Sequence, residues 1–313
     1  MTDKMIIGSR GSALALRQSH TVAQQLSQAH SGLTVEVQII KTKGDLVLDR
    51  PLADIGDKGL FVKELQKALL DGEIHLAVHS LKDLPTESTE GLVLAAVSLR
   101  EDVRDVLVSR VSASLEDLPP GARLGTSSRR RASQLRNFRN DLDICDLRGN
   151  LDTRLRKLDE GQYDAIVLAA AGMRRLGLDS RITQYLSVER CLPSPGQGAL
   201  GIEARQDDEF TLEILKTIDD PATHRCTGAE RAFLGRLEGG CQIPIGAYAQ
   251  VRDGRLVLEG MVGSINGDRL IRSRIEGVPE EAERLGQELA ERVLEMGAGD
   301  ILRDIWTPGR LST

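Results

Sequence analysis

The sequence predicts an α/β protein made of two similar tandem units, followed by a smaller α+β domain. In both units, short apolar strand-like segments alternate with amphipathic helical ones, a pattern typical of mostly parallel sheets covered on both faces. After Pro221 the pattern changes to alternating segments around Asp253-Gly254 and Asn266-Gly267, turns typical of antiparallel strands. We therefore expect two mixed, mostly parallel sheets and one three-stranded antiparallel sheet.

The first unit begins with a buried strand over residues 4–9. Ser12 is suited to cap a helix over about 13–29, because its side chain can accept from the free N–H groups of a first turn. Further strands are expected at 33–40, 74–78 and 92–97, and a helix at 60–70.

The second unit repeats this order of elements. We expect strands at 105–109, 122–126, 142–147 and 164–170, with helices near 128–138 and 150–160. A late strand at 198–204 precedes another helix. Two such units in tandem favour a ligand cleft between them.

The carboxyl-terminal domain starts with a helix over 221–236. Two strands around Asp253-Gly254 and a third at 269–275 form the antiparallel sheet. The last helix is opened by Pro279, which suits the first helical position. Cys241 lies on the loop that enters this sheet.

Composition is that of a soluble globular protein. The chain has 313 residues, 40% hydrophobic and 28% charged, enough for about two domains. The start of the chain has no signal-like pattern, and no segment approaches the ~18 apolar residues of a membrane span. We therefore expect a cytoplasmic protein.

The four cysteines form no C-x-x-C pair and no pattern with histidine, so no metal site is expected. Cys145, Cys191 and Cys226 are typical of inert core thiols in a reducing compartment. Cys241 differs from them, because it follows two glycines and precedes a proline in the segment LEGGCQIPIG.

Positive charge is concentrated in the second unit, although the chain carries a net charge of −6. Residues 123–181 contain twelve arginines and one lysine against eight acidic residues. Arginine suits bidentate capture of carboxylates or phosphates, whereas solvated helix faces are the simpler alternative. Nucleic acid is not expected, because only Phe138 and Tyr163 could stack on bases there.

Arginines recur after three predicted strands of this unit. In GTSSRRR, Thr126, Ser127 and Ser128 precede a helix that begins with three arginines, an arrangement typical of an anion receptor. The remaining arginines of this kind are Arg148, Arg154, Arg174 and Arg175. Together they suggest one cleft that binds a ligand with several negative groups.

The segment HSLKDLP follows the third strand, where α/β proteins place ligand sites. Its adjacent Lys82 and Asp83 could stabilise a developing positive charge or transfer protons, although an ordinary solvated turn has the same composition. The segment GQGALG matches G-x-G-x-x-G, but it follows two prolines and opens a strand. A dinucleotide site is therefore rejected.

These residues make the sequence resemble the porphobilinogen deaminase (hydroxymethylbilane synthase) family. The resemblance spans nearly the whole chain, with matching segments in family order: GSRGSALALRQ, TKGDLVLDRPL, DKGLFVKELQKALL, AVHSLKDLP, GTSSRRR, LRGNLDTRL, LAAAGMRRLGL, PGQGALGIE and LEGGCQIPIG. Each segment alone is a weak indicator of the family, whereas the whole set in this order is highly specific for it.

The resemblance implies a transferase of porphyrin biosynthesis. It condenses four porphobilinogen molecules head to tail, releases ammonia at each addition, and frees linear hydroxymethylbilane with water. One dipyrromethane cofactor per chain is implied, held by a thioether to Cys241, where Gly239 and Gly240 leave room for it. A protease-type nucleophile is the alternative for this thiol, but it needs a partner base, and no histidine is near in sequence.

The resemblance also implies roles for individual residues. Asp83 is the catalytic carboxylate, which assists loss of the aminomethyl nitrogen and stabilises cationic pyrrole intermediates. The cofactor-binding set is Cys241, Lys82, Asp83, Thr126, Ser128, Arg130, Arg131 and Arg148. The substrate-binding set is Arg10, Ser12, Gln18, Lys58, Ser80, Arg148, Arg154 and Arg175.

Two positions depart from the family pattern. Asp54 stands where many bacterial members have lysine, so that Lys58 is expected to carry more of the cofactor contact. Arg129 replaces an aliphatic residue, and its charge either extends the anion receptor or faces solvent.

The family fold implies three domains and a monomer. The first two are lobes resembling periplasmic binding proteins, at 1–98 with 199–216 and at 104–192; the third, at 221–313, carries the cofactor. A non-catalytic anion-binding protein with two such lobes is the competing hypothesis. It would explain the arginines, but not Cys241, the third domain or the Lys82-Asp83 pair.

Overall fold

The computed structural model describes residues 4–42, 62–238 and 243–306. Their contacts divide the chain into two compact units, which are described separately. Unit 1 comprises residues 1–101 and 196–224, and unit 2 comprises residues 102–195 and 225–313. Each unit is therefore assembled from two stretches of chain. Residues 102–195 and 225–313 belong to the same unit. The division of the chain into three domains stays a prediction.

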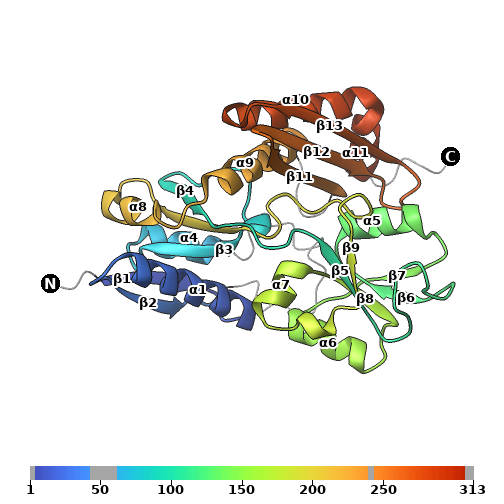
Figure 1. Ribbon diagram of the computed structural model, residues 1–313, viewed down its shortest axis with the longest axis horizontal. Helices are drawn as coiled ribbons and strands as arrows, with labels where there is room; N and C mark the ends of the chain where they lie inside the picture. The colour runs from blue at the N-terminus through green and yellow to red at the C-terminus, as the bar shows by residue number, and fades with distance from the viewer. Residues whose placement is uncertain (1–3, 43–61, 239–242, 307–313) are drawn as a thin grey trace. The chain divides into compact units, whose positions relative to one another are not determined.

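Unit 1 is built on a five-stranded sheet in the order β2-β1-β3-β10-β4 (Figure 1). Its strands are β1 (Lys4–Ser9), β2 (Thr34–Ile39), β3 (Leu76–Ser80), β4 (Leu92–Val97) and β10 (Leu200–Arg205). Four strands run in one direction, and β10 runs against both of its neighbours, β3 and β4. The expected mixed, mostly parallel sheet is thus confirmed.

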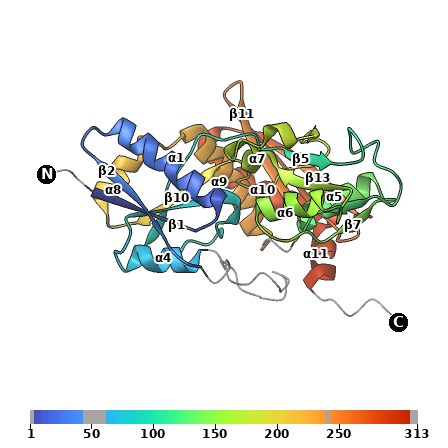
Figure 2. The same ribbon diagram turned by 90° about the horizontal axis from the view of Figure 1, so that it is seen from below.

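Two helices cover opposite faces of this sheet (Figure 2). Helix α1 (Ala13–Ala29) packs Val22 and Leu26 on Ile7 and its neighbours. Helix α4 (Lys63–Leu70) packs Leu65 and Leu69 on the other face. A third helix, α8 (Glu209–Leu215), follows β10 and adds Leu215 to the α1 side. The inner strands β3 and β10 are buried on both faces, whereas the edge strand β2 is largely exposed and alternates polar and apolar residues.

Unit 2 contains a second five-stranded sheet, in the order β7-β6-β8-β5-β9. Here β5 (Asp105–Ser109) opposes the other four strands, which are β6 (Arg123–Gly125), β7 (Asp143–Cys145), β8 (Ala165–Ala169) and β9 (Gln184–Leu186). The helices that accompany it are α5 (Arg129–Phe138), α6 (Leu151–Asp159) and α7 (Ala170–Arg175). The second mixed sheet is also confirmed.

The predicted antiparallel meander completes unit 2. It consists of β11 (Ile245–Arg252), β12 (Arg255–Gly263) and β13 (Leu270–Gly277). Asp253 and Gly254 form the first turn with φ of 50° and 74°, as this type of hairpin turn requires. Helices α9 (Pro221–Arg236) and α10 (Ala282–Val293) contribute Phe233 and Leu289 to the sheet's apolar core.

Some predicted boundaries were wrong. The third strand, expected at 74–78, is Leu76–Ser80, because its pairing with β10 extends to Ser80 opposite Leu200. The apolar run marks where the chain is buried, whereas the partner strand decides where pairing ends. Pro279 opens a 3₁₀ turn, Pro279–Glu281, directly before α10.

Among the elements that had not been predicted are strand β9 and helices α7 and α11 (Gly299–Trp306). Strand β9 has three residues, too few for a periodic pattern. Helix α7 begins within the apolar segment 164–170 that also contains β8, and the sequence pattern therefore predicted one strand over the whole segment.

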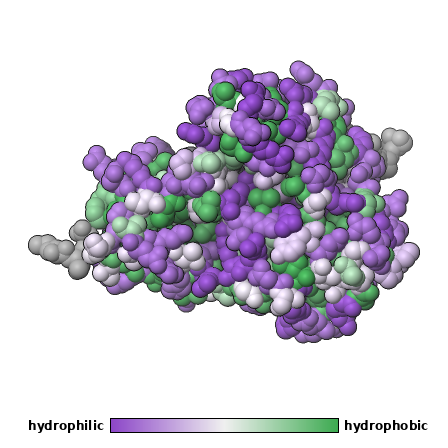
Figure 3. Space-filling view, in the orientation of Figure 1, coloured by the Kyte–Doolittle hydropathy of each residue, from purple (hydrophilic) through white to green (hydrophobic). Residues whose placement is uncertain are grey.

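On the face shown in Figure 3, hydrophobic residues lie in small groups among hydrophilic ones. No helix in the described part of the chain has the length and apolar character needed to cross a membrane.

Candidate active site

A pocket in unit 1 gathers residues from the start of α1 and the end of β3. It is lined by Arg10, Ser12, Leu14, Ala15, Gln18, Val62, Val78, His79, Ser80 and Asp83. Five of them are predicted site residues: Arg10, Ser12, Gln18, Ser80 and Asp83. These positions lie up to 73 residues apart in sequence. They come together because β1 and β3 are parallel neighbours whose carboxyl ends meet at one edge of the sheet.

The turn after β3 presents Lys82 and Asp83. Leu81–Asp83 forms one 3₁₀ turn, and the side chain of Leu81 is buried in the apolar core below it. The backbone N–H of Leu81 donates to the carbonyl of Ala199, at 3.1 Å. Leu81 is thus fixed from two sides, while Asp83 is exposed at the pocket.

A second segment of chain supports this turn. Lys82 Nζ donates to Oε1 of the buried Gln197, at 3.3 Å. The neighbouring Gly198 has φ of +95°, and a Cβ there would lie 2.4 Å from the carbonyl oxygen of Glu101. Only glycine tolerates both conditions. The GQGALG segment therefore shapes the site through its backbone, and no dinucleotide fingerprint is formed, since a strand, β10, begins within it at Leu200 instead of a helix.

Polar contacts join the two walls of the pocket. Gln18 Nε2 donates to Ser80 Oγ, at 2.9 Å, and the Gln18 side chain is buried. Ser12 accepts from the N–H of Ala15, at 3.3 Å, and so caps α1 as expected. Arg10, half-buried, follows β1 directly.

One buried polar group of unit 1 was missed by the sequence analysis. His79 Nε2 lies 2.9 Å from Glu203 Oε2, and both side chains are almost fully buried. Gln66 Nε2 donates to the other carboxylate oxygen of Glu203, at 2.9 Å. This contact joins α4, β3 and β10 beside the pocket. The sequence signal for this buried contact was the single glutamate, Glu203, within the apolar strand GALGIEA.

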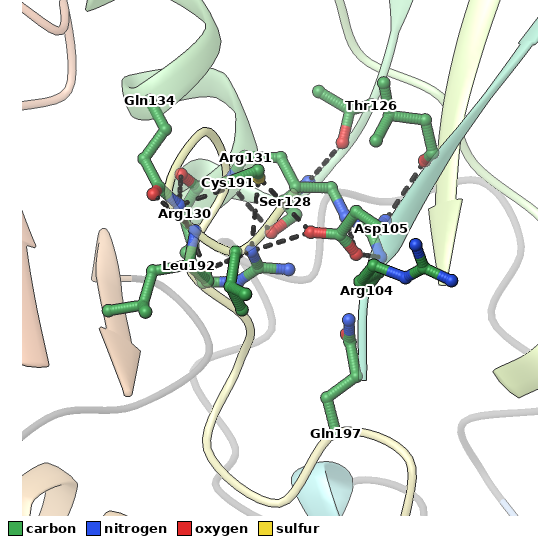
Figure 4. Close-up of polar contacts among 12 residues, drawn as sticks. Arg104, Asp105, Thr126, Ser128, Arg130, Arg131, Gln134, Cys191, Leu192 and Gln197 are labelled. Carbon is green, nitrogen blue, oxygen red and sulfur yellow. Dashed lines mark hydrogen bonds and ion pairs between the residues drawn. The ribbon is translucent and has the colours of Figure 1, made fainter. Parts of the chain in front are cut away.

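Unit 2 contains a separate cluster of the predicted arginines (Figure 4). Arg130 and Arg131 lie in the first turn of α5, and each is about 5% exposed. Arg131 donates through Nε and Nη2 to Asp105 Oδ1, at 3.0 and 2.7 Å. Arg130 Nη1 donates to Asp105 Oδ2, at 2.8 Å. Asp105 was not among the predicted site residues.

The charge state of this cluster follows from its contacts. Burial alone would raise the pKa of Asp105, but the two guanidinium groups outweigh burial and hold that pKa well below its usual range. Burial, and secondarily the negative charge of Asp105, raises the pKa of Cys191 to about 12. The Cys191 thiol is therefore neutral at physiological pH, as expected of an inert core cysteine.

Two positive charges face one negative charge in this cluster, which leaves a net charge of +1. In addition, Nε of Arg130 is buried and has no hydrogen-bond partner among the described residues. A buried donor without an acceptor costs about 1–3 kcal/mol, and more when the group is charged. A carboxylate of a bound ligand is the group that would satisfy both the surplus charge and this donor.

The two hydroxyl residues of GTSSRRR build the loop beside the arginines. Ser128 is the N-cap of α5 and accepts from the N–H of Arg131, at 3.4 Å. The N–H of Ser128 donates to Thr126 Oγ1, at 3.2 Å. Arg129, half-buried, is the first residue of the helix.

The other predicted arginines of unit 2 follow β7 and β8. Arg148 Nε donates to Asp146 Oδ2, at 3.0 Å, and is about a quarter exposed. Arg154 Nε donates to the carbonyl of Gly149, at 2.8 Å. Arg175 ends α7 and is half-buried. Cys241, Lys58 and Asp54 lie outside the described residues.

Comparison with known proteins identifies the family. Residues 5–213 match the model of the porphobilinogen deaminase dipyrromethane cofactor-binding domain, and residues 224–295 match that of the porphobilinogen deaminase C-terminal domain. The chain belongs to the porphobilinogen deaminase family. It is 51% identical to the porphobilinogen deaminase of Syntrophobacter fumaroxidans, over 98% of this chain and 99% of that protein. It is 54% identical to that of Desulforudis audaxviator, over 96% of this chain and 98% of that protein.

Among solved structures, two methionine-binding proteins match at low identity and low TM-score. The methionine-binding protein MetQ is 13% identical with a TM-score of 0.45, over 70% of this chain and 91% of that one. A putative methionine-binding lipoprotein from Bacillus subtilis is 16% identical with a TM-score of 0.43, over 69% and 90%.

Family membership settles the class of the protein. The chain is an enzyme of the hydroxymethylbilane synthase type, a transferase of porphyrin biosynthesis that uses a dipyrromethane cofactor. The arginine cluster fits that cofactor, because dipyrromethane carries several carboxylates, and the buried Nε of Arg130 lacks an acceptor among the described residues.

Proposed function

We propose that the pocket at the end of β3 is the place of condensation, with Asp83 as the catalytic carboxylate. The observation that supports this most directly is the gathering of Arg10, Ser12, Gln18, Ser80 and Asp83 around one pocket. A cation, three hydrogen-bonding side chains and a carboxylate are what a substrate with two carboxylates and a leaving amine requires.

Each of these groups has a step to assist. Arg10 binds a carboxylate of porphobilinogen by charge-assisted hydrogen bonds, and Ser12 and Ser80 add hydroxyl donors. Positive charge develops on the pyrrole ring as the aminomethyl nitrogen leaves. A fixed carboxylate at Asp83 lowers the energy of that state more than the energy of bound substrate.

The cofactor is proposed to be attached through a thioether to Cys241, one per chain. When bound, dipyrromethane supplies the pyrrole carbon that receives the first substrate unit. Lys82, Thr126, Ser128, Arg130, Arg131 and Arg148 are proposed to hold its carboxylates, together with Asp83 on the pyrrole nitrogens. Arg148, Arg154, Arg175 and Lys58 are proposed to bind the carboxylates that accumulate on the growing chain.

We further propose that the enzyme is a cytoplasmic monomer without nucleic-acid or membrane partners. Its three domains would comprise residues 1–98 with 199–216, 104–192 and 221–313. The discontinuous first domain is supported by β10, which lies between β3 and β4 in the sheet of unit 1.

Intact mass of the purified protein tests the attachment. We expect an excess equal to two porphobilinogen-derived units in the wild type, and none in Cys241→Ser. Cys145→Ser is the matched control, because that half-buried thiol has no proposed role. An unmodified wild type that still makes product, or an excess retained in Cys241→Ser, would refute the attachment at this residue. An unmodified and inactive wild type that gains neither mass nor activity on addition of porphobilinogen would also refute the attachment.

A further inference from the structure

A buried carboxylate lies in the arginine cluster and has no role in the function proposed above. Asp105 is the first residue of β5 and is 0% exposed. We propose that Asp105 is a positioning residue: it fixes both arginine head groups and cancels one of their two charges, so that the pair binds one ligand carboxylate. This inference rests on the proposed function, since that carboxylate is one of the cofactor's.

The two oxygens of Asp105 are divided between the two arginines. Oδ1 accepts from Nε and Nη2 of Arg131, and Oδ2 accepts from Nη1 of Arg130. Because the carboxylate is a single rigid group, it fixes the spacing of the two guanidinium groups. Ion pairs with this geometry are directional as well as strong.

Backbone carbonyls complete the positions of the head groups. Arg130 Nη1 also donates to the carbonyl of Leu192, at 2.7 Å, and Arg131 Nη1 donates to that of Val167, at 3.1 Å. Gln134 holds Leu192 in place, since its Oε1 accepts from the Leu192 N–H at 2.7 Å. Asp105 is the negatively charged member of this buried group (Figure 4).

Besides the two arginines, the carboxylate of Asp105 accepts from one neutral donor, a thiol. Cys191 Sγ lies 3.3 Å from Asp105 Oδ2. A thiol donates there without adding a second negative charge, so the cluster keeps a net charge of +1. With Asp105 removed, two buried positive charges would repel each other, and neither would be held in one orientation.

Loading of the cofactor tests this role independently of turnover. Protein free of cofactor, produced in cells that make no porphobilinogen, is mixed with porphobilinogen, and the fraction with added mass is followed over time. For Asp105→Asn we expect loading slower by about tenfold or more, because charge-assisted hydrogen bonds are lost. Asp105→Glu keeps the charge but moves it by one methylene. We expect it to load several-fold more slowly, because the displaced carboxylate no longer sets the spacing of the two guanidinium groups. Its unfolding temperature should fall less than that of Asp105→Asn, because the buried charges stay paired.

Asp141→Asn is the matched control. Asp141 forms a bidentate pair with Arg139 in the same unit but at its surface, and this variant should load like the wild type. A merely structural role would instead make loading follow thermal stability, with Asp105→Glu like the wild type in both. Wild-type loading rates in both Asp105 variants would overturn the inference. Loss of the fold in both variants would overturn it too, because the carboxylate would then act on stability. Failure of the wild type to gain mass would instead refute the proposed function.

Discussion

Gln18 of α1 and Ser80 of β3 are joined side chain to side chain, with Nε2 and Oγ 2.9 Å apart. Both residues line the pocket, and the contact connects positions 62 apart in sequence. It shows that Gln18 orients a pocket hydroxyl, in addition to any contact that it makes with substrate.

Replacing Gln18 with alanine should therefore affect both binding and stability. The lost hydrogen bond and buried contacts should lower the free energy of unfolding by about 1–2 kcal/mol, and KM for porphobilinogen should rise more than kcat falls. Gln25→Ala, on the exposed face of the same helix, is the control for helix propensity. An unchanged KM would show that the contact serves packing alone.

Asp83→Asn should abolish most turnover without loss of the fold. The side chain is exposed, so its removal costs little stability, whereas loss of one group that stabilises developing charge typically costs ~10²–10³ in rate. Circular dichroism and steady-state kinetics measure the two effects. Glu90→Gln, an exposed carboxylate on the following loop, should retain wild-type kinetics. A loss of less than about tenfold would contradict the role assigned to Asp83.

Arg148→Leu should stall elongation. Arg148 is partly exposed and held by Asp146, so that its charge is placed for a chain that gains carboxylates at each addition. Mass spectra of the enzyme during turnover should show one partly extended species accumulating. Arg156→Leu removes an exposed arginine from α6 that pairs with Glu160, and it should leave the distribution unchanged. The same distribution in both variants would argue against the role of Arg148.

Glu203→Ala should destabilise unit 1. It removes the close contact of Glu203 Oε2 with His79 Nε2 and leaves the half-buried Gln66 without its acceptor, so the free energy of unfolding should fall by about 1–3 kcal/mol. Urea unfolding measures the loss. Glu203→Gln keeps an acceptor and should lose less; equal losses in the two variants would show that the charge matters and the hydrogen bond does not.

Asp105 should contribute to stability at neutral pH and lose that contribution in acid. Its pKa in the fold lies well below the unfolded value of about 3.9. The contribution is therefore fully present above the unfolded pKa and is lost as pH falls towards the folded pKa. The difference in unfolding free energy between wild type and Asp105→Asn should be constant from about pH 8 to 5 and should narrow below about pH 4. A difference that widened in acid would have the wrong sign for this ion pair.

The sequence was informative where periodicity and turn chemistry act locally. Helix Ala13–Ala29, strand Asp105–Ser109 and the hairpin at Asp253-Gly254 lie where they were predicted. Local signals suffice there, because a cap, an apolar run or a positive φ depends on neighbouring residues.

Contacts between distant segments could not be predicted in this way. No local pattern shows that Ser80 pairs with Leu200, or that Asp105 receives Arg130 and Arg131. An aspartate before an apolar strand has the composition of an ordinary strand end, and only its burial distinguishes it. Sequence pattern singled out the arginines and Asp83, and the family resemblance supplied their expected roles, whereas the groups that hold them required the fold.

The central place of β10 bears on how the protein is made. In unit 1, β10 lies between β3 and β4, although it begins only at Leu200. A ribosome must therefore translate all of residues 102–195 before the first sheet can close. Until then the nascent chain carries two unpaired strand edges, which are templates for aggregation. Translation at ~5–20 residues per second keeps them open for several seconds, so a chain that stops before Leu200 is expected to aggregate through these edges.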